Sequence, residues 1–285
     1  MPELAWVNGK LSGLAEAVVP CLDRGNLFGD GVYEVVRVYA GRPFAQERHL
    51  RRLKKSLAAV QIEAPLETRE LDLQVRDLIT RSGIGEAQVY IQITRGAAPR
   101  QHAFPRDARP SLILFVLKVE TDFRWRETGC QAISLPDDRW AHCHIKSLNL
   151  LPNVLAKEKA RSKGAQEALF VAGGGAKVRE GSSSNVFALL DGKVVTPPAD
   201  GHILAGITRE IFLELAETAG LPVLEQDLSL AELLEAQEVF FTSTVSEYLP
   251  VSELDGKRIG TGHPGPKGQE LYALYSQLCQ TGDGS

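Results

Sequence analysis

The first 118 residues alternate between strand-like and helix-like spacing of hydrophobic positions. Residues 32–39 (VYEVVRVY) are rich in β-branched and aromatic side chains, which favours a strand. Over residues 47–60, leucines recur at intervals of three and four, which predicts a helix with one apolar face. The same reasoning predicts a hairpin with an Asn8-Gly9 turn, a helix from Leu71 that stops near Gly83, and strands over 87–96 and 111–119.

The second part of the chain has more strands than helices, in mixed order. Strands are expected over 131–136, 167–172, 182–190 and 238–244, and helices from Pro152 to Gly164 and over 206–220 and 268–280. Because strands and helices do not alternate strictly, a two-domain α/β (α+β) arrangement fits better than a doubly wound sheet. We predict a small N-terminal domain over 1–118, a linker over 119–124 and a larger domain over 125–285.

Composition and charge narrow the classes of function. The chain has 285 residues, 44% hydrophobic and 24% charged, as in ordinary globular proteins. A net charge of −4 gives no broad attraction to nucleic acid or anionic lipid, and neither a secretory leader nor a membrane span is expected. Four scattered cysteines are typical of a reducing cytoplasm. No metal site is expected at residues 142–144 (HCH), because strand alternation would place the cysteine opposite the two histidines.

Lys146, in the segment HIKSLN, is the first candidate for chemistry. We expect it on a strand, on the same face as His144, where a buried amine is costly unless it is paired or neutral. A desolvated, neutral lysine is a good nucleophile toward a carbonyl group. The alternative is a lysine at the end of a strand that extends its amine to water, and spacing alone favours this alternative.

Two further segments offer groups that suit an anion. Glu180 precedes a glycine and three serines, so its loop either orients a heteroaromatic ring or is a solvated turn. A helix is predicted to begin at residues 206–208, where Thr208 is expected to act as the cap and the free N–H groups suit a phosphate. Residues 242–244 offer more hydroxyl groups, although every helix has an N-terminus and the signal alone is weak.

Residues 97–110 form a long proline-bearing loop with two cationic side chains, Arg100 and His102. Two cations in one loop can hold a carboxylate. The alternative is a surface loop that happens to be basic, and the loop by itself favours that interpretation.

Together, these segments resemble the fold type IV enzymes that depend on pyridoxal 5′-phosphate (PLP). The motifs, in order, are RGNLFGDGVYEVVRVY, QITRGAAPRQHAFP, HIKSLNLLPNVLAKEKA, EGSSSNVF, GITRE and FTSTVSEYLP. The resemblance extends from about Trp6 to the final helix. The family includes D-amino-acid transaminases, branched-chain aminotransferases and aminodeoxychorismate lyases, and the first of these subfamilies matches best. It implies a two-domain fold and favours a chemical role for Lys146.

The resemblance also implies how the cofactor is held. Lys146 would carry PLP as a Schiff base and then transfer the Cα proton of the substrate. Glu180 would pair with the pyridine nitrogen and keep it protonated, which makes the ring a better electron sink. Arg52, with Arg51 as the neighbouring alternative, would bind the phosphate. The other implied cofactor contacts are Ser183, Leu204, Ile207, Thr208 and Thr244.

Substrate binding and assembly follow from the same resemblance. In D-amino-acid transaminases a tyrosine, an arginine and a histidine hold the substrate α-carboxylate, and the matching residues are Tyr33, Arg100 and His102. The arginine and histidine reach in from the neighbouring subunit, so a homodimer with a shared active site is implied. Holding the carboxylate on one side determines which face of Cα presents its hydrogen to Lys146.

The expected activity is ping-pong transamination between a D-amino acid (D-alanine, D-glutamate) and a 2-oxo acid (2-oxoglutarate, pyruvate) in the cytoplasm. Neither nucleic acid nor membrane is an expected partner. An L-branched-chain aminotransferase, which does not depend on the Arg-x-His pair, and an aminodeoxychorismate lyase are alternatives. A non-catalytic PLP carrier is disfavoured, because Lys146 and Glu180 are both present.

Two positions depart from the family pattern. Asn26 stands where the family has an aromatic residue, and Arg179 precedes Glu180. Arg179 either faces solvent, which is the favoured interpretation, or points inward, where it would favour dicarboxylic substrates such as D-glutamate.

Overall fold

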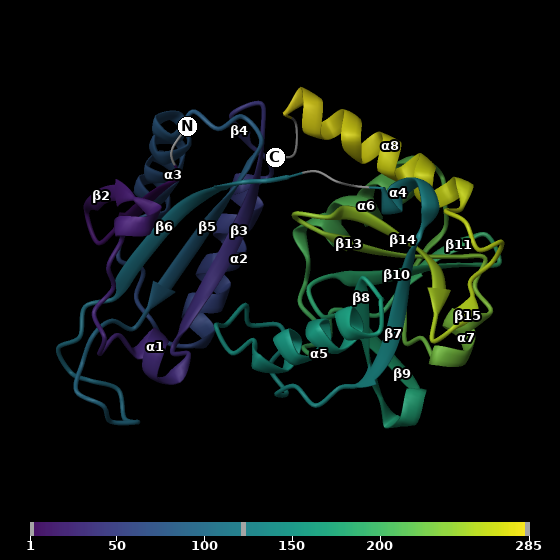
Figure 1. The fold of residues 1–285 in the computed structure, drawn as a ribbon, viewed down its shortest axis with the longest axis horizontal. Helices are drawn as coiled ribbons and strands as arrows, with labels where there is room; N and C mark the ends of the chain where they lie inside the picture. The colour runs from purple at the N-terminus through teal and green to yellow at the C-terminus, as the bar shows by residue number, and fades with distance from the viewer. Residues whose placement is uncertain (1–2, 121–123, 283–285) are drawn as a thin grey trace. The chain divides into compact units, whose positions relative to one another are not determined.

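The computed structural model describes residues 3–120 and 124–282, which divide into two compact units (Figure 1). The described residues of the first unit are 3–120, 145–149 and 279–282, and those of the second are 124–144 and 150–278.

This division differs from the predicted single break, because two later stretches of chain are grouped with the first unit. Of the predicted linker, residues 121–123 lie outside the described residues.

The first unit contains an antiparallel sheet with strand order β2, β1, β6, β5, β3, β4. Its strands are β1 Leu4–Val7, β2 Lys10–Gly13, β3 Gly31–Tyr39, β4 Arg42–Pro43, β5 Ala87–Thr94 and β6 Ser111–Lys118. Its helices are the 3₁₀ helix η1 Leu14–Glu16, and α1 Arg24–Phe28, α2 Gln46–Ala59 and α3 Thr68–Ser82. Helices α2 and α3 share one hydrophobic core with the sheet (Figure 1).

Strand β3 shows which face of this sheet packs against the helices. Successive side chains of a strand point to opposite faces. Val32 and Val36 belong to the core shared with helices α2 and α3. Tyr33 and Val35 therefore point to the opposite face, which the helices leave uncovered.

Several sequence predictions for this unit are confirmed. Asn8 and Gly9 both have positive φ (48° and 92°) in the turn between β1 and β2, as a two-residue hairpin requires. The leucines of the predicted helix are buried in α2. Helix α3 ends at Gly83, which adopts the left-handed conformation with φ of 64°.

The second unit contains a mixed sheet with strand order β12, β11, β10, β13, β14, β7, β8, β9, and β15 pairs with β14. Its strands are β7 Cys130–Pro136, β8 Glu167–Ala172, β9 Lys177–Gly181, β10 Asn185–Leu190, β11 Lys193–Thr196, β12 Val223–Glu225, β13 Glu238–Ser243, β14 Glu247–Leu254 and β15 Lys257–Arg258. The remaining helices are α4 Trp125–Thr128, α5 Leu151–Ser162, the 3₁₀ helix η2 Gly173–Gly175, α6 Ile207–Thr218, α7 Leu230–Leu234 and α8 Pro266–Thr281.

Mixed pairing in this sheet confirms the α/β (α+β) prediction. Strand β7 pairs in parallel with both β14 and β8, whereas β10 and β13 are antiparallel. The predicted helix start at residues 206–208 is confirmed, but the predicted cap is wrong: α6 is capped by Gly206, and Thr208 lies inside the first turn. A residue with no side chain at the cap leaves the first N–H groups of α6 without a side-chain acceptor. Within the described residues, no helix is long and apolar enough to cross a membrane.

Candidate active site

The segment around Lys146 is not a strand, which corrects the sequence prediction. Its backbone forms hydrogen bonds with strand β3 and helix α2 and does not pair continuously with another strand. The N–H of Tyr33 donates to the Lys146 carbonyl at 3.0 Å, and the N–H of Lys146 donates to Oγ of Ser56 on α2 at 3.2 Å. A single bridge between Val32 and Ser147 completes the pairing.

Two glycines before and in β3 allow the Lys146 segment to approach this closely. A Cβ atom on Gly31 would lie 2.8 Å from Cδ1 of Leu148 and 2.7 Å from the carbonyl oxygen of Ile93. A Cβ on Gly29, which has φ of +65°, would lie 2.7 Å from Oδ1 of Asn149. The FGDG motif therefore has a steric role in seating the lysine segment.

The side chains of Tyr33 and Lys146 are brought together in the first unit. The Nζ atom of half-buried Lys146 lies 4.3 Å from the centroid of the Tyr33 ring. Tyr33 stacks on Tyr90, which stacks on Phe115, with centroid distances of 5.5 and 4.6 Å. Aromatic packing of this kind fixes the orientation of the ring next to the amine.

On the covered face, a buried carboxylate orients Arg52. Oε1 and Oε2 of Glu34 accept hydrogen bonds from Nε and Nη2 of Arg52 at 2.7 and 2.9 Å. Nδ1 of His49 lies 2.9 Å from Oε2 of Glu34. Arg51, the alternative phosphate-binding candidate, is exposed and pairs with Glu47. The geometry therefore favours Arg52 as the residue held in a fixed orientation.

Burial and neighbouring charges shift the pKa values of this cluster. Burial alone would raise the pKa of Glu34, but the charge and hydrogen bonds of Arg52 outweigh it and hold the pKa well below its usual range. Burial lowers the pKa of His49 below its ordinary value of 6.5, against the opposing effect of Glu34. His49 is therefore neutral at pH 7 and donates its Nδ1 proton to the carboxylate.

We expect the folded protein to lose stability as the pH falls below about 6.5, with His49 as one cause. Because its pKa is lowered in the folded protein, His49 binds a proton more readily in the unfolded chain, so the equilibrium moves toward unfolding as the pH falls. His49→Asn keeps a donor near Glu34 without titrating. Between pH 6.5 and 5, the variant should lower the pH slope of the unfolding free energy by up to about 1.4 kcal/mol per pH unit. Urea unfolding at several pH values measures both slopes, and identical slopes would contradict the assignment.

Residues 97–110, here called the Arg-x-His loop, bring Arg100 and His102 to one aromatic ring. The guanidinium carbon of Arg100 lies 5.2 Å from the ring centroid of Phe28, and the His102 ring lies 5.3 Å from the same centroid. Both cationic residues are exposed. The loop therefore presents an arginine and a histidine together to solvent.

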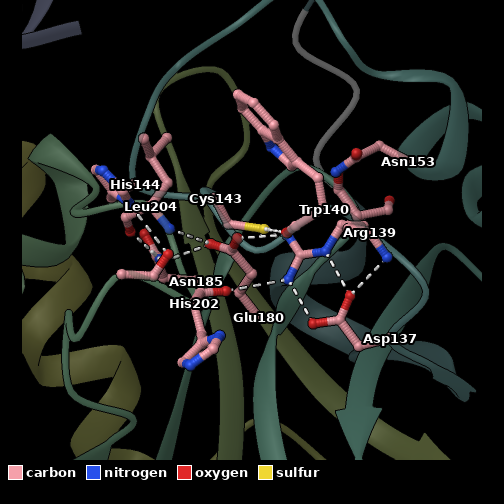
Figure 2. A network of polar contacts seen from close by, with 12 residues as sticks. Asp137, Arg139, Trp140, Cys143, His144, Asn153, Glu180, Asn185, His202 and Leu204 are labelled. Carbon is pink, nitrogen blue, oxygen red and sulfur yellow. Dashed lines mark hydrogen bonds and ion pairs between the residues drawn. The ribbon is translucent and has the colours of Figure 1, made fainter. Parts of the chain in front are cut away.

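In the second unit, Glu180 is the centre of a buried polar network, shown in Figure 2. Its Oε1 accepts a hydrogen bond from Nη1 of Arg139 at 2.6 Å. Its Oε2 accepts from Nδ2 of Asn185 and from the backbone N–H of Leu204, each at 3.1 Å. Three donors on one buried carboxylate stabilise its ionised form.

Arg139 is itself fixed from the other side. Asp137 accepts two hydrogen bonds from the guanidinium of Arg139, to Oδ1 at 2.8 Å and to Oδ2 at 3.0 Å (Figure 2). Burial alone would lower the pKa of the Arg139 guanidinium, but the hydrogen bonds of Asp137 and the charge of Glu180 outweigh it and raise the pKa. Arg139 is thus a permanent cation that holds Glu180 in place.

The serine loop that follows Glu180 is organised by a second buried carboxylate, Glu167. Its oxygens accept hydrogen bonds from the Ser182 hydroxyl, from Oγ of Ser184 at 3.0 Å and from Oγ of Ser183 at 3.4 Å. Ser183 therefore contacts Glu167. Strand β10 begins at Asn185, after this loop.

The predicted phosphate contacts of the second unit lie on two elements. Ile207 and Thr208 are buried in the first turn of α6, where backbone N–H groups have no partner within the helix. Thr244 lies in the turn after β13, and the neighbouring hydroxyl of Thr242 is buried without a hydrogen-bond partner among the described residues. Leu204 is tied to Glu180 through its N–H.

Two further sequence interpretations can be compared with the structure. Arg179 does not face solvent: its side chain is 12% exposed and its Nη1 lies 3.9 Å from Oδ2 of Asp200. Among the described residues, no group of three histidine, cysteine or acidic side chains is arranged to hold a metal ion. Burial raises the pKa of the Cys143 thiol to about 11, so at neutral pH it is protonated and a poor ligand.

A protein-family model and several D-alanine aminotransferases match most of this chain. The family model for amino-transferase class IV matches residues 31–254. The D-alanine aminotransferase of Bacillus licheniformis is 41% identical over 259 residues, which cover 91% of each chain. That of Staphylococcus haemolyticus is 39% identical over 277 residues, which cover 97% of this chain and 98% of the relative.

Solved structures with a similar fold include branched-chain amino acid aminotransferases. The Escherichia coli enzyme gives a TM-score of 0.91 at 28% identity, covering 98% of this chain and 94% of that one. A second such enzyme, solved with pyridoxamine 5′-phosphate, gives 0.90 at 25% identity, covering 99% and 95%. The predicted fold type IV architecture is confirmed. The chain belongs to the amino-transferase class IV family.

Proposed function

We propose that this protein is a PLP-dependent aminotransferase. It would move the amino group between a D-amino acid, such as D-alanine or D-glutamate, and a 2-oxo acid, such as 2-oxoglutarate or pyruvate, in ping-pong half-reactions. D-alanine aminotransferases are 37–41% identical to this chain over nearly its whole length, which supports the choice of D-amino acids.

The observation that carries the proposal is the buried carboxylate of Glu180, fixed by Arg139, Asn185 and the N–H of Leu204. An ionised carboxylate held by several hydrogen-bond donors suits a protonated ring nitrogen. When bound, PLP supplies an electron sink for the charge left on the substrate Cα after its proton is removed. Glu180 would keep the ring nitrogen protonated, and the donor set of this chain fits that cofactor.

Other residues would bind the cofactor and move the proton. Lys146 would bind it covalently through Nζ and, once released, move the proton of the substrate Cα. Arg52, held by Glu34, would bind the phosphate together with the first-turn N–H groups of α6 at Ile207 and Thr208 and the hydroxyls of Thr208 and Thr244. Ser183 and Leu204 would also contact the cofactor, Leu204 at its pyridine ring.

Tyr33, Arg100 and His102 would hold the substrate carboxylate, the last two from a neighbouring subunit of a homodimer. An apolar face on α5 supports the dimer: Leu151, Val154 and Leu155 are each more than half exposed at helical spacing. A monomeric mass in light scattering would contradict this assembly.

The four cysteines are free, which is consistent with a reducing cytoplasm as the proposed location.

An L-branched-chain aminotransferase is the second candidate, because the similar solved structures bear that name. Those structures are at most 28% identical to this chain, against 41% for the Bacillus licheniformis D-alanine aminotransferase. The higher identity and the Arg-x-His loop favour the D-specific activity.

The two candidates separate in one spectroscopic experiment on the PLP-loaded protein. We expect D-alanine, added alone, to bleach the visible cofactor band and release pyruvate, with little change on adding L-alanine or L-leucine. Bleaching by L-leucine instead would establish the branched-chain activity. No reaction with either isomer would remove transamination and favour the lyase alternative.

A further inference from the structure

We propose that Arg24 is a positioning residue that holds the Arg-x-His loop in the geometry needed to bind the substrate carboxylate. The proposal rests on the proposed function, which gives this loop that role. Arg24 itself touches neither substrate nor cofactor in this assignment. It acts through the main-chain carbonyl groups of residues 101–103.

The guanidinium of Arg24 binds three consecutive carbonyl groups of the loop. Nη1 donates to the carbonyl of Gln101 at 2.6 Å and to that of Ala103 at 3.4 Å, and Nη2 donates to the carbonyl of His102 at 3.2 Å. The side chain of Arg24 is 3% exposed, whereas the loop residues it binds are exposed. A buried cation therefore holds the backbone of an exposed loop between Arg100 and Phe104.

Arg24 is fixed in turn by a carboxylate anchored in the fold. Its Nε donates to Oδ2 of Asp30 at 2.7 Å, and Asp30 also accepts two hydrogen bonds from Arg95, at 2.9 and 3.0 Å. Arg95 donates further to the carbonyls of Val60 and Gln61 after α2. The loop carbonyls are thereby connected through Arg24, Asp30 and Arg95 to the body of the first unit.

The aromatic ring of Phe28 adds a second contact to the same assembly. The guanidinium carbons of Arg24 and Arg100 lie 4.8 and 5.2 Å from its centroid, and His102 contacts it as well. The N–H of Arg24 also donates to the carbonyl of Gly96 at the start of the loop, at 2.9 Å. Both proposed carboxylate-binding side chains therefore rest on a ring carried by the same short helix, α1, as Arg24.

Only an arginine can make this set of contacts. Its planar guanidinium has five donors in a fixed fork, so it can bind Asp30 on one edge and several carbonyls on the other. A lysine keeps the positive charge but not the fork. Holding the loop in advance removes an ordering cost that substrate binding would otherwise have to meet. Arg24→Lys should therefore weaken carboxylate binding more than it slows catalysis.

The test uses the PLP-loaded protein and propanoate, which is alanine without its amino group. Calorimetry gives the dissociation constant of propanoate, and steady-state assays give kcat and KM for D-alanine. For Arg24→Lys we expect the dissociation constant and KM to rise about tenfold, with kcat changed less than about threefold. Cofactor absorption should be unchanged. Arg106→Lys, a charge-conserving change at an exposed position of the same loop, is the matched control and should resemble the wild type.

If Arg24→Lys does not fold, Asp30→Asn replaces it, because this variant keeps Arg24 but weakens its anchor. Propanoate binding within twofold of the wild type in the folded variant would overturn the proposal, as would an equal loss in Arg106→Lys. A wild-type protein that binds no propanoate would overturn it as well. A wild-type protein that binds propanoate but does not transaminate D-alanine would instead contradict the proposed function, and propanoate binding by the variants would still decide the role of Arg24.

Discussion

Replacing Lys146 with alanine is expected to reduce kcat for D-alanine transamination by about a thousandfold or more. The side chain would supply both the covalent bond to the cofactor and the amine that moves the Cα proton, and positioned acid–base groups alone contribute about 10²–10⁴-fold. Its Nζ lies 4.3 Å from the ring centroid of Tyr33, a residue proposed to hold the substrate. The measurement is the initial rate of pyruvate formation, together with the visible spectrum of the protein.

The fold should tolerate this substitution, because the segment is seated by its backbone. The Lys146 carbonyl and N–H bind Tyr33 and Ser56, and alanine keeps both groups. Circular dichroism and the melting temperature should therefore stay close to those of the wild type. Lys159→Ala, which removes an exposed lysine on α5, is the matched control and should remain active. Near-normal turnover in the Lys146 variant would contradict the proposed mechanism.

The sequence predicts the elements of this fold well where the signal is local. The β-branched and aromatic residues of β3, the leucines of α2 and the glycine that ends α3 each act within a few residues, and the strand, helix and helix end that they predict are found in the structure. The strand predicted around Lys146 is wrong because its backbone partners lie near residues 31–33 and 56, far away in the sequence. An apolar segment can satisfy its backbone in several ways, and local pattern does not choose among them.

The same limit explains which residues of the candidate site were missed. Glu180 is conspicuous beside its serines, but the cation that holds it, Arg139, is 41 residues away. Arg24 binds carbonyls 77 to 79 residues further along the chain. No periodicity connects such partners. In the sequence, both arginines lie in polar segments, LDRGN and PDDRW, which give no sign of burial.

Arg179 shows the converse error, in which a plausible surface residue is buried. Alternation along β9 would place it on the face opposite Glu180, and solvent was the simpler expectation for a long cationic side chain. The structure instead leaves it 12% exposed near Asp200. Pairing with an acidic residue from a different segment offsets the cost of burying the charge.

Glu180→Gln is expected to lower the rate of the half-reaction with D-alanine by about a hundredfold, with a smaller change in KM. An amide has no charge to keep the ring nitrogen protonated, so the charge that develops at Cα would be stabilised less. The carboxylate oxygens accept hydrogen bonds from Arg139, Asn185 and Leu204. Glutamine keeps only one accepting oxygen and places an NH₂ donor beside the other donors, so part of these hydrogen bonds would be lost. The rate is measured by rapid mixing, from the bleaching of the cofactor band.

Two companion variants separate charge from packing at this position. Glu180→Asp keeps the charge in a shorter side chain and should retain more activity than the glutamine variant. Glu217→Gln removes an exposed carboxylate near the C-terminal end of α6 and should leave the rate unchanged. If the glutamine variant loses activity only because the network of Figure 2 collapses, the aspartate variant will be equally slow. A glutamine variant within threefold of the wild type would show that Glu180 does not control the cofactor ring.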